Sequence, residues 1–212
     1  MEEKSNQAAF MSALVTEHFV LQSAASTTVS EAGVRASLYV FSLSSALVAM
    51  GFTAQSPRVF VPLVATVIPA VFVLGWFTVV RLVDTTVENL QFLRAIARIR
   101  RYYRTLTPDA AAYFAPWETN EDEGAEALAV MAVKPGGMAP FFTTASMVST
   151  INGLVGGVGA ALLAGQPLGR PAAIPLGAAA ALAFIGVGYV YQRRRLTAAA
   201  TAAQHRWAPS AR

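Results

Sequence analysis

The chain contains no cysteine and only two histidines, His18 and His205. Disulfide bonds and thiolate metal sites are therefore excluded, and neither histidine has a second ligand residue at metal-binding spacing. The sequence also lacks a Gly-x-Ser-x-Gly motif, a phosphate-binding loop and a His-Glu-x-x-His motif. We therefore expect no enzymatic activity, no cofactor and no bound metal.

Charged residues are also scarce, at 13% of the 212 residues, whereas soluble domains average about 25%. Four long windows contain none at all, and they lie between Arg35 and Arg58, Arg58 and Arg81, Lys134 and Arg170, and Arg170 and Arg193. A transmembrane helix needs about 20 mostly apolar residues. A soluble helical bundle would instead show polar faces at helical spacing. The sequence therefore predicts an all-α polytopic membrane protein with four spans, at Ser37–Thr53, Val59–Val80, Phe141–Leu163 and Ala172–Tyr191.

The links between the first two spans and between the last two are short, so we expect two transmembrane hairpins. Of the 16 Lys and Arg residues, only Arg58 and Arg170 lie in the hairpin loops. Basic residues near span ends favour the cytoplasm, so both termini are expected there, in a cell (inner) membrane. The predicted segments are a cytoplasmic amphipathic helix leading into the first span, the first hairpin, a cytoplasmic basic helix and loop, the second hairpin, and a basic tail, at residues 1–36, 37–80, 81–140, 141–191 and 192–212.

A Thr-Thr-Val step occurs twice, within Ser26–Glu31 and within Asp84–Asn89. The first copy fits a capping box, in which the hydroxyl and the carboxylate satisfy backbone amides, and it predicts a helix that starts at Thr28. Residues 81–106 repeat apolar side chains at spacings of three and four, so they are predicted to continue the second span as an amphipathic helix. Three interpretations of the repeat stay open: capping, coincidence, or a shared cytoplasmic pore mouth formed by Thr28, Glu31, Thr86 and Glu88.

Arginines crowd the distal end of the predicted 81–106 helix, at Arg94, Arg98, Arg100, Arg101 and Arg104. They fit a solvated face that sets the topology. They also fit a polybasic site for anionic lipid headgroups or a partner protein, with contacts at Arg94, Arg98, Arg101 and Arg104. Nucleic-acid binding is not expected, because the topology already accounts for the basic residues.

Within the four predicted spans there is no Asp, Glu, Lys, Arg or His, which argues against proton relays and ion-coupled transport. Small residues at close helical spacing let membrane helices approach one another, and the third span carries such a set in Gly153, Gly156, Gly157 and Ala160, next to Asn152.

The first span is the most polar. Its residues Ser42, Ser45 and Ala49 share one face, which is either a packing seam or the lining of a water-filled path in an oligomer.

An amphipathic helix, a two-span hairpin and a long basic helix follow one another within residues 8–106. This layout resembles the two-span SLATT-type effectors of bacterial nucleotide-linked defence systems, and the resemblance implies an oligomer that permeabilises the membrane. The second hairpin, 141–191, departs from that plan. The sequence thus favours an oligomeric channel or pore-forming protein in the lipid bilayer, most simply a homo-oligomer with a cytoplasmic gating or assembly region. The alternatives are a non-conducting scaffold that binds a cytoplasmic partner and a small-solute transporter without ion coupling.

Overall fold

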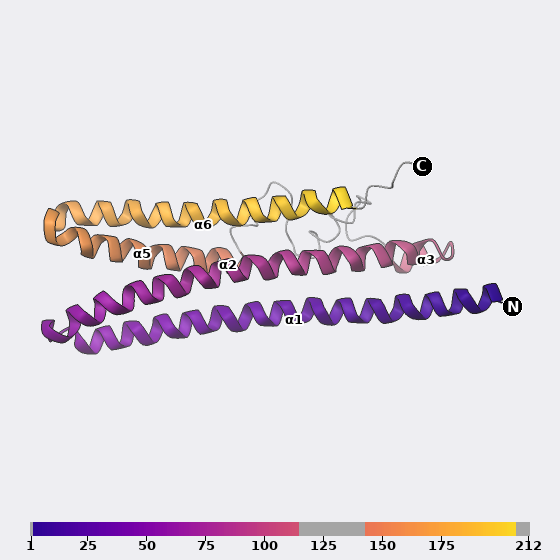
Figure 1. Ribbon diagram of the computed structural model, residues 1–212, viewed down its shortest axis with the longest axis horizontal. Coiled ribbons are helices and arrows are strands. Elements are labelled where there is room, and N and C mark those ends of the chain that lie inside the picture. The colour runs from indigo at the N-terminus through magenta and orange to yellow at the C-terminus, as the bar shows by residue number, and fades with distance from the viewer. Residues whose placement is uncertain (1, 115–142, 207–212) are drawn as a thin grey trace. The chain divides into compact units, whose positions relative to one another are not determined.

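The computed structural model describes residues 2–114 and 143–206, and every regular element within these ranges is a helix (Figure 1). The predicted all-α class is therefore confirmed. The helices are α1 (Glu2–Thr53), α2 (Pro57–Arg104), α3 (Ala110–Tyr113), α5 (Thr144–Leu168) and α6 (Arg170–Arg206). Four of them, α1, α2, α5 and α6, are long and apolar enough to cross a membrane, in agreement with the four predicted spans.

Several predicted boundaries are corrected by the helices. The predicted helix start at Thr28 is wrong, because α1 runs unbroken from Glu2 to Thr53 and needs no cap there. The Thr28 hydroxyl donates instead to the carbonyl of Ala25, at 2.7 Å. The predicted continuation of the second span is confirmed, since α2 extends to Arg104. Helix α6 continues past Tyr191 into the predicted tail. Helix α5 continues past the predicted end of the third span at Leu163. The predicted start of that span, Phe141, lies outside the described residues.

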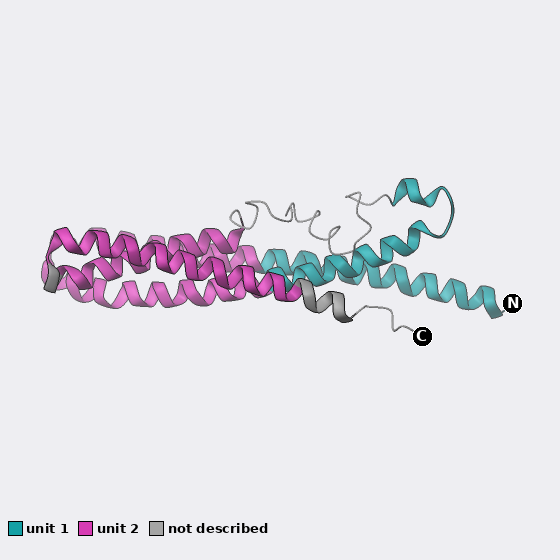
Figure 2. Ribbon diagram, turned by 90° about the horizontal axis from the view of Figure 1, so that it is seen from above, with its two compact units in different colours: residues 1–31, 85–139 teal, residues 32–84, 140–212 magenta. Residues whose placement is uncertain are grey.

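The chain divides into two compact units (Figure 2). Unit 1 comprises residues 1–31 and 85–139, and unit 2 comprises residues 32–84 and 140–212. Helices α1 and α2 each contribute one segment to both units.

Unit 1 is built from the first part of α1 and the last part of α2, which pack through aromatic and apolar side chains. On α2, Leu90, Ala97 and Tyr103 are buried. The Phe10 ring of α1 meets the Tyr102 ring edge-on, with centroids 5.6 Å apart. These contacts satisfy the amphipathic pattern that the sequence carries at spacings of three and four.

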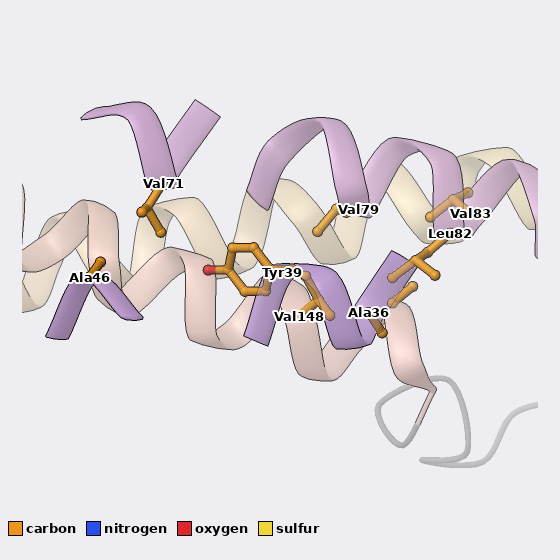
Figure 3. Close-up of a cluster of buried hydrophobic side chains, with 9 residues drawn as sticks. Ala36, Tyr39, Ala46, Val71, Val79, Leu82, Val83 and Val148 are labelled. Atoms are coloured by element: carbon orange, nitrogen blue, oxygen red, sulfur yellow. The ribbon is translucent and has the colours of Figure 1, made fainter. Parts of the chain in front are cut away.

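The core of unit 2 joins three helices (Figure 3). Small and β-branched side chains dominate its buried members, and Tyr39 adds a large aromatic ring. The buried members are Ala36, Tyr39 and Ala46 of α1, Val71, Val79, Leu82 and Val83 of α2, and Ala145 and Val148 of α5. Small core residues let helices approach closely, which is how helices associate in lipid, where burial of apolar surface supplies no net driving force.

Helix α6 packs on α5 through glycine and alanine. A Cβ atom built on Gly157 of α5 would lie 2.6 Å from the carbonyl oxygen of Gly177 and 2.6 Å from the Cβ of Ala181, both on α6. A Cβ built on Gly177 would lie 2.6 Å from the Cβ of Ala161. The two backbones are therefore close enough that neither position accepts a side chain.

We predict that Gly157→Ala destabilises unit 2 and that Gly186→Ala does not. The added methyl at Gly157 meets backbone atoms of α6, and overpacking of this kind costs about 1–3 kcal/mol. A Cβ at Gly186 has nothing within 4 Å, so alanine there gains up to about 1 kcal/mol of helix propensity. Thermal unfolding of both variants in the same detergent measures the difference. Equal changes in Tm would show that α5 and α6 are not in close backbone contact.

Candidate functional site

The three predicted pore-lining residues lie on α1 in unit 2, in unlike surroundings. Ser42 is half-buried, and its hydroxyl donates to the carbonyl of Leu38 at 2.8 Å. Ser45 and Ala49 are exposed. The side chains exposed beside Ser45 along the helix are apolar, with Leu38 60% and Phe41 71% exposed. The face is thus a hydroxyl among large apolar groups rather than a continuous polar strip.

The four predicted pore-mouth residues all belong to unit 1. Thr28 is buried, at 8% exposure, and its hydroxyl lies 3.5 Å from Oδ1 of Asn89 on α2. Glu31, Thr86 and Glu88 are half-buried, and each has an interaction partner. Thr28 therefore lies at the contact between α1 and α2 in unit 1.

The predicted arginine contacts are also partly engaged within the protein. Arg104 donates from Nη1 to the carbonyl of Phe114, at 3.1 Å, which ties α2 to the end of α3. Arg94 and Arg98 are half-buried, and each has an interaction partner in the chain. Arg101 is exposed. Of the four predicted contacts, Arg101 therefore offers its side chain most openly to a headgroup or a partner.

The glycine set of α5 faces two other helices. A Cβ on Gly153 would lie 2.6 Å from the side chain of Ile185, and a Cβ on Gly156 would lie 2.6 Å from the ring of Phe72. Gly157 meets α6 as described above, and Ala160 is half-buried. These positions are close contacts of α5 with α6 and α2.

A row of buried polar side chains runs along α5 in unit 2, and the sequence analysis named Asn152 among them but not the two serines. Ser146, Ser149 and Asn152 follow at intervals of three residues, with exposures of 7%, 4% and 1%. The Ser146 hydroxyl donates to Oε1 of Gln192 on α6, at 2.9 Å. At the start of α5, the Thr143 side chain accepts from the Ser146 backbone amide, at 3.2 Å. The serine and asparagine spacing was the signal available in the sequence.

Asn152 joins three helices. Its Nδ2 donates to the backbone carbonyl of Phe72 on α2, at 3.1 Å, and its Oδ1 accepts from the Tyr39 hydroxyl of α1, at 3.2 Å. Gly75 makes the space, because a Cβ there would collide with Oδ1 of Asn152. Likewise, a Cβ on Gly188 of α6 would collide with the hydroxyl oxygen of Ser149. Two glycines on two different helices therefore admit two successive side chains of the polar row.

The polar row contains neutral groups alone. The Ser149 hydroxyl oxygen is buried without a hydrogen-bond partner among the described residues, whereas the groups before and after it in the row are paired. Serine, asparagine, glutamine and tyrosine groups donate and accept hydrogen bonds, and none of them is ionised at neutral pH. The row therefore fixes helix register and offers no acid or base.

His18, which lies outside the predicted spans in unit 1, has a shifted pKa. Burial lowers the pKa of His18 below its usual 6.5, and the nearby Arg100 guanidinium lowers it further. The imidazole lies against the Tyr103 ring, with centroids 6.3 Å apart, and Tyr103 also meets Phe114 at 5.3 Å. Within the described ranges no group of three or more metal-ligating side chains gathers around His18 or elsewhere.

A scan against protein-family models, a search of curated proteins and a search of solved structures each find no match. The resemblance of residues 8–106 to SLATT-type effectors therefore stays a hypothesis. The class of protein supported by the four apolar helices is an integral membrane protein with several spans.

We predict that Tyr39→Phe lowers the stability of unit 2 by about 1 kcal/mol, because Oδ1 of Asn152 loses its buried donor. Thermal unfolding in detergent gives the change in Tm. Tyr113→Phe is the matched control, since that side chain is 83% exposed. An unchanged Tm in Tyr39→Phe would mean that the Asn152 junction contributes nothing.

We predict that the stability of unit 1 falls as the pH drops below 6.5. The folded protein binds its His18 proton less tightly than the unfolded chain, because the folded pKa is the lower of the two. Stability is therefore full above the unfolded pKa and decreases as the pH falls toward the folded one. Hydrogen exchange of α1 amides at pH 5.5 and pH 8 measures the effect. His18→Gln should remove this pH dependence and His205→Gln should keep it; the reverse result would assign it elsewhere.

Proposed function

We propose that this protein is an oligomeric membrane channel in which α1 lies nearest the conduction path, with both termini on the cytoplasmic side. The observation that carries the proposal is the exposure of α1. The share of its apolar window that the chain buries is 11%, against 17% for α2, 33% for α5 and 22% for α6. The helix least covered by its own chain is the one with most surface left for other copies or for water.

The side chains on that surface support the same proposal. Ser45 is exposed, and its hydroxyl makes no hydrogen bond to the described part of the chain. A hydroxyl facing hydrocarbon finds partners only in the protein, such as a carbonyl of its own helix, whereas one facing a water-filled path is hydrated. Leu38 and Phe41, exposed beside it, would form an apolar constriction, and such constrictions close channels by excluding water. The resulting channel is closed at rest.

We predict that Phe41→Ser increases ion or dye flux through reconstituted liposomes several-fold, because a hydroxyl replaces an apolar barrier group. Leu182→Ser on α6 is the matched control, since Leu182 and Phe41 are both 71% exposed. Ser45→Asp should change the cation preference of the flux without reducing assembly. Flux that stays at the level of empty liposomes in every variant, with assembly intact, would sink the channel proposal.

A second candidate function, a membrane scaffold, is favoured by the surface of unit 1. Phe19, Val20 and Val29 of α1 are 65%, 57% and 61% exposed. Exposed apolar side chains on a helix outside the membrane offer contacts to another protein. Phe19→Ser with Val29→Ser should abolish capture of such a partner and leave flux unchanged. Loss of flux alone in this variant would favour the channel.

A further inference from the structure

Helix α6 carries one exposed apolar face along its span. On this face Leu182, Val187 and Val190 are 71%, 54% and 47% exposed. Because α6 is long and apolar enough to cross a membrane, the face is available to the acyl chains of lipid. The residues that α6 buries lie on the opposite side and follow at spacings of four and seven, at Gly177, Ala181, Gly188 and Gln192.

Two arginines stand at the end of this face. Arg193 and Arg194 are exposed, and they follow Val190 by three and four residues, so that both are its neighbours on the helix surface. The uncharged window before them begins after Arg170 and covers about 35 Å of helix. The hydrocarbon core of a bilayer is about 30 Å thick. Arg193 and Arg194 therefore lie at the depth of the phospholipid headgroups.

The next arginine along the helix, Arg195, is paired within unit 2, and these two are not. Nη2 of Arg195 donates to Oδ1 of Asp84 on α2, at 2.6 Å. The side chains of Arg193 and Arg194 make no hydrogen bond or ion pair to any residue that the structure describes. Two guanidinium charges are thus left at the end of the apolar face. A phosphate group complements them in charge and in hydrogen-bonding geometry.

The direction of side chains on a helix carries these two groups back over the membrane span. Long side chains in an α-helix lean toward its N-terminus, and α6 starts at the far end of the span. The stems of Arg193 and Arg194 can therefore lie along the turn of Val190, with their charged ends among the headgroups. Arg58 and Arg170 are also exposed, but they are the second and first residues of α2 and α6. Their side chains lean away from the span.

We propose that Arg193 and Arg194 bind the headgroup of an anionic phospholipid, whose acyl chains lie along Leu182, Val187 and Val190. A zwitterionic lipid binds less tightly, because the two guanidinium groups repel the cation of its headgroup. The arginines of α2 that the sequence analysis assigned to headgroups lie in unit 1, so this site is a separate one. It goes beyond the proposed channel and does not depend on conduction.

Lipid titration of the purified full-length protein tests the site. In a neutral detergent, native mass spectrometry gives dissociation constants for phosphatidylglycerol and for phosphatidylcholine with the same acyl chains. Each basic residue at a charged headgroup contributes about a factor of five in affinity. The natural chain should therefore prefer phosphatidylglycerol about 25-fold. Arg193→Gln with Arg194→Gln should remove the preference, and Arg193→Lys with Arg194→Lys should keep most of it.

The matched control is Arg58→Gln with Arg170→Gln, which removes two exposed arginines and the same net charge. Its lipid preference should equal that of the natural chain. Equal loss of preference in this control would show an effect of net charge alone and would overturn the site. An unchanged preference in Arg193→Gln with Arg194→Gln would also overturn it. Release of the lipid by millimolar inorganic phosphate at constant ionic strength would assign the two arginines to a soluble anion instead.

Discussion

The amide of Asn152 holds unit 2 together where three helices meet. It donates to a backbone carbonyl of α2 and accepts from a tyrosine hydroxyl of α1, and it is carried by α5. In lipid the association of helices depends on close packing and on such hydrogen bonds. Gly75 leaves the space for the amide, and the apolar core of Val79, Leu82 and Val148 surrounds it. The positions of α1 and α2 against α5 depend on this junction.

Glycine and alanine have two different roles in the same helices. At Gly157, Gly177 and Gly188, atoms of the facing helix fill the space that a Cβ would need. These glycines therefore set the distance between α5 and α6. A Cβ added at Gly33, Gly51 or Gly186 would have nothing within 4 Å. The contrast separates glycines in close contact with a neighbouring helix from glycines on the exposed surface, and the second group falls on α1 and α6.

The four long apolar helices could be predicted from the four uncharged windows, because an apolar stretch of about 20 residues without charge is typical of a membrane helix. The helix start at Thr28 was wrong, since Thr and Glu three residues apart also fit a helix interior, where the hydroxyl bonds back to a preceding carbonyl. The end of α6 was missed because arginines mark the membrane boundary and not the helix end. The partners Tyr39 and Gln192 of the polar row come from distant parts of the chain, and no local pattern encodes that pairing.

The neutrality of the polar row has a consequence for how the membrane segments respond to voltage. A potential of 100 mV does about 2.3 kcal/mol of work on one elementary charge that crosses the membrane. The Ser146, Ser149 and Asn152 side chains carry no formal charge, and neither do the sequence windows that flank Arg58. Moving these side chains within the membrane would therefore carry no formal charge through the field.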